Sequence, residues 1–286
     1  DYTIEQLNRV ARLLREEHAF RGYIHLKTIP DADPLLIEEA GRYADRLSVN
    51  IELPTDQSLS RLAPEKQAGS IRLAMKVIHE GAHQAQAEHR AASFAPAGQS
   101  TQMIVGADAT DDRTILRTAE TLYGAYRLKR VYYSAFSPIP QSPRSVPQQP
   151  PPLLREHRLY QADFLLRGYG FKSEELLPKA GDLALDIDPK LAWALANRAL
   201  FPLDLNRAEP ALIARVPGIG VLNARRLVEL RRERRLRYAD LQRLRCAVEK
   251  AAPFIITQDY RPQQATLESA VLRQRLRDHS TQLELW

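Results

Sequence analysis

The chain has 286 residues, of which 44% are hydrophobic, and its 41 Lys and Arg against 35 Asp and Glu give a formal net charge of +6. The single cysteine, Cys246, excludes an internal disulfide framework and a cysteine-rich metal site within the chain, and no apolar run reaches the roughly 18 residues of a membrane span. The first residues form no signal peptide, so we expect a soluble cytoplasmic protein of one large or two modest domains with an anionic partner.

Helix and strand patterns alternate four times in the first half of the chain. The expected helices begin at residues 3, 34, 66 and 112, with a short helical turn at 56–63, and the expected strands cover 23–29, 46–54, 101–106 and 130–136. Such alternation predicts parallel strands joined by helical crossovers, in an open α/β sheet or in a (β/α) barrel.

The first two expected strands are polar on one face only. The polar residues of these strands are Tyr23, His25 and Lys27, then Ser48, Asn50 and Glu52. Because helices cover the outside of such a sheet, we expect these side chains to face an interior ligand cavity, since a packed core would not tolerate unpaired charges. Two alternatives stay open: a purely structural ion pair between Lys27 and Glu52, and a first strand that is an exposed edge.

Three histidines of the helix over residues 66–92 follow helical spacing, as in some metal sites. His79, His83 and His89 lie near Glu80 and Glu88. The helix is highly polar, however, so a solvated face is the better interpretation.

A proline-rich stretch at 138–152 predicts an extended linker. An amphipathic helix follows from residue 153, another covers 189–200, and a short strand is expected at 254–256. The expected organisation is an α/β domain at 1–137, the linker, a helical connector at 153–202, a helical domain at 203–257 and a polar tail at 258–286.

The segment Val216–Gly220 is a glycine-rich turn between two expected helices. Asn206 and Glu209 have the spacing of a capping box for the first helix. Gly218 and Gly220 lack Cβ atoms, so another backbone can approach closely. The second helix then begins with N–H groups that have no helical partner, which suits a phosphate.

The positive charge around this turn favours the binding of an anion. Residues 204–250 hold twelve Lys and Arg against six Asp and Glu, a net +6. The segment resembles the helix-hairpin-helix of DNA-binding proteins, and Arg231–Leu241 resembles the start of the next half of such a domain, without the glycine usual near Arg235. The candidate DNA-binding residues are Gly218, Ile219, Gly220, Asn223, Arg225 and Arg226. The alternative is a turn that merely joins two packed helices. Cys246 lies in a helical stretch, where we expect a buried apolar role rather than a reactive thiol.

Four further stretches resemble one radical S-adenosylmethionine (radical SAM) family. They are Gly22–Pro30, Ala40–Pro54, Thr101–Ala107 and Arg155–Asp163. The similar proteins are associated with DNA modification or DNA repair, are linked to a uracil-DNA-glycosylase-like partner, and end in a helix-hairpin-helix. The resemblance implies a partial TIM-type (β/α) barrel of the radical SAM kind followed by an α-helical helix-hairpin-helix domain.

The resemblance also implies cofactors and their positions. S-adenosylmethionine would lie near Ser48, Asn50, Glu52, Gln102 and Gly106, and the substrate side would be lined by Tyr23, His25 and Lys27. The family's [4Fe–4S] iron–sulfur cluster is held by a C-x3-C-x2-C loop after the first barrel strand. This sequence has no such loop, so we expect the first strands and the cluster ligands to lie upstream of Asp1.

Two hypotheses about function follow. In the first, the intact protein is an enzyme that acts on DNA through a 5′-deoxyadenosyl radical, although the chain as given would be inactive. In the second, the chain is a catalytically inactive DNA-binding adaptor for a DNA-repair enzyme.

Overall fold

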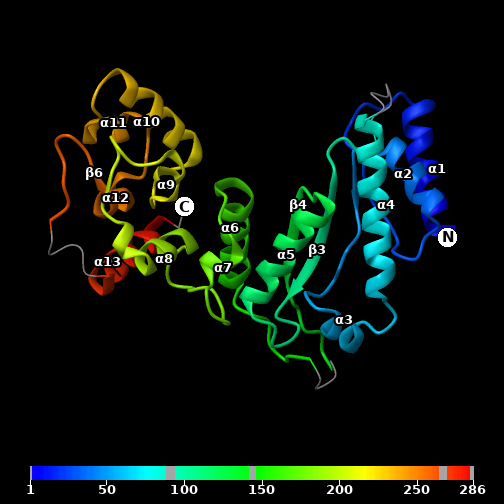
Figure 1. The fold of residues 1–286 in the computed structure, drawn as a ribbon. Coiled ribbons are helices and arrows are strands. Elements are labelled where there is room, and N and C mark those ends of the chain that lie inside the picture. Colours follow the sequence, from blue (N-terminus) through cyan, green and yellow to red (C-terminus); the bar gives the residue numbers. More distant parts are fainter. Residues whose placement is uncertain (1, 88–93, 142–145, 264–268, 284–286) are drawn as a thin grey trace. The chain divides into compact units, whose positions relative to one another are not determined.

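The computed structural model describes residues 2–87, 94–141, 146–263 and 269–283 (Figure 1). It divides into two compact units, residues 1–156 and 157–286. The division falls within one helix, α6 (Leu153–Tyr169), whose first turn belongs to the first unit.

The first unit is built on a parallel sheet of four strands. The strands are β1 (His25–Lys27), β2 (Arg46–Ser48), β3 (Gln99–Val105) and β4 (Arg130–Ala135), hydrogen-bonded in the order β1-β2-β3-β4. The helices are α1 (Tyr2–Glu16), α2 (Pro34–Tyr43), α3 (Asp56–Leu62), α4 (Ala68–Ala87) and α5 (Asp112–Tyr126). The expected alternation of helices with parallel strands is confirmed.

One face of this sheet carries the hydrophobic core. Leu47, Met103 and Val131 point to that face and are completely buried. The side-chain amide of Gln99, on the same face, donates to the carbonyl oxygen of Met75 in α4 at 3.1 Å and to that of Tyr126 in α5 at 2.9 Å. Helices α4 and α5 therefore cover this face, and α2 packs beside α4 (Figure 1).

The first two strands are shorter than the sequence predicts. β2 ends at Ser48, and beyond it Glu52, which has a left-handed φ of +61°, forms an isolated bridge to Met103 of β3. The N–H of Glu52 donates to Gln102 O at 3.2 Å and its carbonyl accepts from Ile104 N at 2.7 Å, so the chain stays beside β3. β1 is an edge strand with a single neighbour, and only three of its seven expected residues pair.

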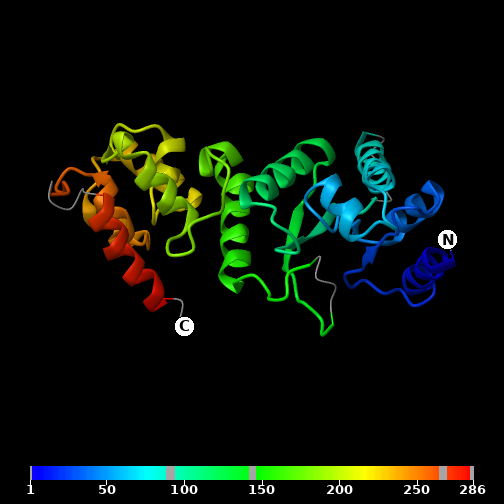
Figure 2. The same cartoon turned by 90° about the horizontal axis from the view of Figure 1, so that it is seen from below.

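The second unit is mainly helical. Its helices are α7 (Ser173–Leu176), α8 (Pro189–Ala196), α9 (Pro210–Arg215), α10 (Val221–Glu233), α11 (Tyr238–Arg243), α12 (Val248–Ala251) and α13 (Ser269–Leu283). Two 3-10 turns cover Arg198–Leu200 and Ala252–Phe254. Figure 2 shows α13 (red), which is joined to the segment before α8 by a bidentate ion pair from Arg273 to Asp186 at 2.7 and 2.8 Å.

A chain of aromatic rings forms the core of this unit. Phe171, Trp193, Phe201 and Phe254 meet edge to face, with ring centroids 5.1, 6.1 and 5.2 Å apart in turn. Such pairs add roughly 0.5–1.5 kcal/mol each beyond the burial of their area. The core thus links the loop before α7, helix α8, and the 3-10 turn Ala252–Phe254.

A two-stranded parallel sheet closes the segment that contains the glycine-rich turn. β5 (Leu203–Asp204) pairs with β6 (Ile255–Ile256), and Leu205 N donates to Ile256 O at 3.0 Å. The expected short strand at 254–256 is therefore confirmed over two of its residues, while its partner β5 was not expected.

The predicted capping box of α9 is wrong. Glu209 is the N-cap residue and makes no side-chain cap hydrogen bond. The Asn206 side chain instead accepts from Leu236 N at 2.7 Å, so it joins the start of the segment to the end of α10. Pro210 lies in the first turn of α9, where its missing N–H costs no hydrogen bond. Among the described residues, no helix is both long and apolar enough to cross a membrane.

Candidate functional site

The face of the sheet opposite α4 and α5 is polar. The strand register places on it His25, Lys27, Arg46, Ser48, Ser100, Gln102, Tyr132 and Ser134, with Asn50 continuing the line of Ser48. The polar sets of the first two strands therefore do lie opposite the helices. Ser48 and Asn50 are buried, whereas Gln102 and Tyr132 are partly exposed.

Two hydrogen bonds cross this polar face. Asn50 Nδ2 donates to Gln102 Oε1 at 3.3 Å, which joins two of the residues expected to contact S-adenosylmethionine. Arg46 Nη1 reaches Tyr132 Oη at 3.4 Å and so spans β3 from β2 to β4. The polar side chains of this face thus hydrogen-bond to one another across the strands. The amides of Asn50 and Gln102 could give up their mutual hydrogen bond and bind a ligand.

Glu52 is paired with Lys66, whose Nζ donates to its Oε1 at 2.6 Å. The expected alternative of an ion pair with Lys27 is therefore wrong. Lys27 and His25 are exposed, and Tyr23 is 58% exposed. Burial, with a smaller effect of the Arg46 charge, lowers the pKa of His25. His25 and Lys27 lie on the edge strand β1 and Tyr23 lies two residues before it, and all three are exposed, which agrees with the alternative of an exposed edge.

The loop after β3 is closed by a hydrogen-bond network around Asp108. Ser58 Oγ donates to Asp108, and Thr110 N and Arg61 Nη2 donate to it at 3.0 and 3.2 Å. Burial opposes ionisation of this carboxyl, but the hydrogen bonds from Ser58 and Thr110 prevail, so the pKa of Asp108 is lowered. The network ties α3 to the carboxyl end of the sheet.

The first turn of α6 seals the same end of the sheet. Arg155 Nε donates to the fully buried Asp112 at 2.8 Å, and Glu156 Oε2 accepts from Ala135 N, also at 2.8 Å. Pro151 lies against Gly106, which has a φ of +79°, so closely that a Cβ on Gly106 would come within 2.7 Å of the proline ring. Ligands of parallel sheets usually bind at this end, but here the chain's own residues occupy much of it.

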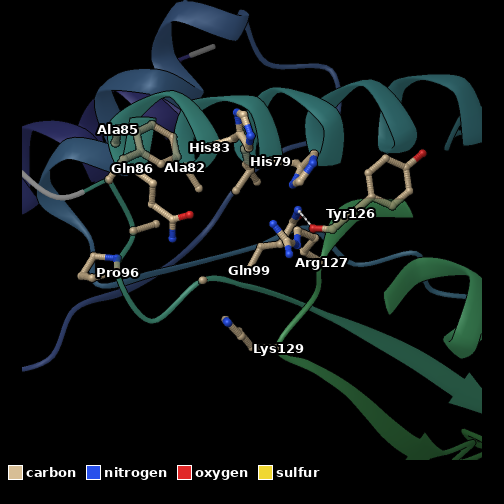
Figure 3. Close-up of a pocket in the computed structure, with 14 residues that line it drawn as sticks. His79, Ala82, His83, Ala85, Gln86, Pro96, Gln99, Tyr126, Arg127 and Lys129 are labelled. Atoms are coloured by element: carbon tan, nitrogen blue, oxygen red, sulfur yellow. Dashed lines mark hydrogen bonds between the residues drawn. The ribbon is translucent and has the colours of Figure 1, made fainter. Parts of the chain in front are cut away.

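Figure 3 shows a pocket of about 710 Å³ at the opposite, amino end of β3. Its polar lining residues are His79, His83, Gln86, Gln99, Arg127 and Lys129, with Tyr126 beside them. His83 is exposed and His79 is partly exposed, in agreement with the expected solvated face, and both border this pocket; His89 lies outside the described residues. Within the described residues, no group of three His, Cys, Asp or Glu side chains could hold a metal ion.

The glycine-rich turn joins α9 to α10 in the second unit. Gly218 has a φ of +80°, and a Cβ there would come within 2.4 Å of Ala247 O. The Gly218 carbonyl accepts from Ala247 N at 3.0 Å, so two main chains touch at this point. Only glycine permits this approach.

The N-terminus of α10 has no side-chain cap. Gly220 is its N-cap residue, and the first intrahelical hydrogen bond runs from Ala224 N to Gly220 O at 2.8 Å. The N–H groups of the three preceding helical residues have no helical acceptor. Ile219 is 1% exposed, its N–H donates to Val216 O at 3.1 Å and its carbonyl accepts from Lys190 Nζ, so among the candidate residues it has a structural role in the turn. Asn223 hydrogen-bonds the thiol of the buried Cys246, which gives its side chain a packing role.

A second turn of the same form follows between α11 and α12. Arg245 has a left-handed φ of +56°, and Ala251 N donates to Ala247 O at 3.0 Å, as Ala224 N does to Gly220 O. Ala251 and Phe254 are buried at the positions that correspond to Ala224 and Leu227. The sequence indicated only the start of this second half, because arginine stands where a glycine would mark the turn.

The arginines of this segment fall into two groups. Arg231 donates to Ala208 O at 2.6 Å and Arg234 donates to both oxygens of Asp240, so these side chains hold the fold together. Arg207, Arg215 and Arg243 also form ion pairs, with Asp204, Glu175 and Asp240. The arginines of the second group are exposed, and their side chains make no hydrogen bond or ion pair with the described part of the chain. They are Arg225, Arg226, Arg232, Arg235 and Arg245.

Comparison with protein-family models, with curated proteins and with solved structures gave no match.

Proposed function

We propose that the chain binds DNA without reading its sequence, through a surface formed by the turn Val216–Gly220, the first turns of α10 and the exposed arginines around them. The observation that carries the proposal is the uncapped N-terminus of α10 beside arginine side chains that are not used within the described structure. Main-chain N–H groups and unpaired guanidinium groups are the usual partners of phosphates.

The unpaired arginines support DNA binding more strongly than the net charge of the segment does by itself. Charges that already form internal ion pairs release few counterions when DNA binds, whereas exposed unpaired charges release one for each phosphate they neutralise. The second turn adds Arg245 to the surface, because its neighbour Ala247 contacts Gly218 directly. A fold-stabilising hairpin without a ligand would not need this set of exposed cations.

The test is charge reversal with a matched control. Arg225→Glu with Arg226→Glu should weaken binding to any duplex by about tenfold or more at moderate salt, uniformly across sequences. Arg9→Glu with Arg42→Glu makes the same change in net charge on exposed residues of the first unit and should leave affinity nearly unchanged. Equal losses in the two double variants would refute the proposed surface.

We also propose that these residues belong to a radical SAM enzyme that modifies or repairs DNA. The support is the sequence resemblance, together with consecutive parallel strands whose helices cover one face and whose other face is polar, as a partial (β/α) barrel requires. Asn50 and Gln102 are the residues of that face best placed to hydrogen-bond S-adenosylmethionine. Glu52 is paired and Gly106 is covered, so they contribute less to such a site, whereas Ser48 is as buried as Asn50.

The iron–sulfur cluster does not fit the residues of this chain. Three thiolates are needed, and Cys246 is alone and buried in the second unit. The reaction is therefore proposed only for a protein that receives its cluster ligands from outside these residues. Anaerobic reconstitution of this chain should give no stable iron or sulfide, whereas about four of each per chain would overturn this conclusion.

The second candidate function is a DNA-binding adaptor without catalysis, acting beside a uracil-DNA-glycosylase-like enzyme. The lone cysteine favours it. The two candidates separate in a protein extended upstream of Asp1: cluster binding and cleavage of S-adenosylmethionine support the enzyme, and DNA binding without either supports the adaptor.

A further inference from the structure

Lys190 lies directly behind the glycine-rich turn. It is the second residue of α8, and its Nζ donates to Ile219 O at 2.6 Å. The same ammonium lies 4.6 Å from the centre of the Tyr169 ring, at the end of α6. Tyr169 in turn places its hydroxyl near Gly220, 3.5 Å from where a Cβ would lie. The amine is thus held between the turn and α6.

The groups around this amine do little to neutralise its charge. Asp188, the N-cap residue of α8, is itself paired with Lys250 of α12, at 3.6 Å. The other titratable neighbours are the Tyr169 hydroxyl on α6 and the thiol of Cys246 from the second turn, and burial raises the pKa of that thiol. Burial lowers the pKa of Lys190 to about 7, against a smaller opposing effect of Asp188 and Cys246.

The contact couples the charge of Lys190 to the turn. A protonated amine both donates to Ile219 O, which fixes the peptide before Gly220, and adds positive charge beneath the N-terminus of α10. A neutral amine provides a weaker donor and no charge. An anion at the main-chain N–H groups of α10 would therefore favour the protonated form.

We infer that Lys190 is a positioning residue of the turn and that DNA binding is coupled to the uptake of one proton by its amine. This inference rests on the proposed DNA binding and deepens it. The ligand that drives proton uptake is a phosphodiester at the N-terminus of α10, and no contact between Lys190 and a base is required.

The sign of the coupling follows from linkage. Below about pH 7 the amine is already charged in the free protein, so affinity is at its maximum. Above that pH the free protein is neutral at Lys190 and must take up a proton to form the best complex. Affinity therefore falls as pH rises, by up to about tenfold for each unit by which DNA raises the pKa of Lys190.

The experiment measures the Kd of a short duplex from pH 6 to pH 9 at constant ionic strength. The wild-type protein should weaken as pH rises. Lys190→Arg, whose charge does not titrate, should bind with the low-pH affinity throughout, and Lys190→Met should bind weakly throughout. The difference between wild type and Lys190→Arg removes the contribution of every other titrating group.

A second measurement uses the wild-type protein, so that its result does not depend on whether the variants fold. An NMR titration of the Lys190 side chain should give a higher pKa in the presence of DNA than in its absence. Equal pKa values, or a wild-type pH profile retained in Lys190→Met, would overturn the inference while leaving DNA binding intact. Wild-type affinity in the Arg225 and Arg226 double variant would instead refute the proposed surface itself.

Discussion

Lys66 Nζ lies 2.6 Å from Glu52 Oε1, and this ion pair spans from the residue that ends the ladder beside β3 to the loop before α4. The Glu52 side chain is only 14% exposed, so its charge depends on that partner. The pair holds in place a residue whose left-handed backbone would otherwise be unfavourable.

Removing this partner should destabilise the first unit. We expect Lys66→Met to lower the free energy of unfolding by about 1–3 kcal/mol, because a largely buried carboxylate loses its charged donor. Lys27→Met, which removes an exposed lysine from the same sheet, should stay within about 0.5 kcal/mol of wild type. Urea unfolding of both variants checks this, and equal effects would show that the ion pair contributes nothing specific.

A methyl group at Gly218 should disrupt the second unit. Gly218→Ala is unfavourable for two reasons. The φ of Gly218 is +80°, and a Cβ at this position would lie 2.4 Å from the carbonyl oxygen of Ala247. We expect a loss of about 2–4 kcal/mol, measured by thermal or urea unfolding. The control is Gly124→Ala in α5, where a Cβ meets nothing within 4 Å and where alanine should stabilise by about 0.5–1 kcal/mol.

The salt dependence of DNA binding should report how many arginines contact phosphates. Arg225→Ala with Arg226→Ala should reduce the slope of log K against log salt by about 1.8, because each lost phosphate contact removes roughly 0.9. Arg234→Ala, which breaks an internal ion pair, should lower stability without this change of slope. An unchanged slope in the first variant would place the contacts elsewhere.

Asp240 should make stability depend on pH in the acid range. The bidentate hydrogen bonds from Arg234, and a further one from Arg237 N at 2.8 Å, lower the pKa of Asp240. A carboxyl with a lowered folded pKa stabilises the fold above its unfolded pKa of about 3.9, and this contribution is lost as pH falls through the folded value. Asp240→Asn should therefore be less stable than wild type at pH 7, and the two should converge as pH approaches 2. A constant difference would contradict this.

Periodicity was sufficient to predict the helices of the first unit, its four strands and the polar face of its sheet, because each depends on which side of an element is buried. It did not predict α7, α11 and α12 of the second unit. It could not predict where β2 ends or the left-handed backbone of Glu52, since neither breaks a sequence rule. The ion-pair partner of Glu52 could not be predicted from the sequence either. Lys66 and Lys27 are equally suitable donors, and only the fold brings Lys66 near Glu52.

The same limit applies to the candidate sites. The spacing of Asn206 and Glu209 fits a capping box, but the Asn206 side chain instead accepts a hydrogen bond from Leu236 N, 30 residues away. Gly218 and Gly220 marked the first turn because glycine is rare in helices, whereas Arg245 carries no such mark. The proline-rich stretch was expected to be a linker, yet Pro151 packs against Gly106.

The pairing of β5 with β6 has a consequence for how the second unit assembles. This ladder joins the two ends of the segment that contains both turns, so its closure costs the entropy of a long loop and returns few hydrogen bonds. The helices between the strands must form first, because their contacts are local and cooperative. The Leu205 N–H, bonded to Ile256 O, should then be among the first amides of this segment to exchange with solvent, so opening of the unit begins at the seam where its ends meet.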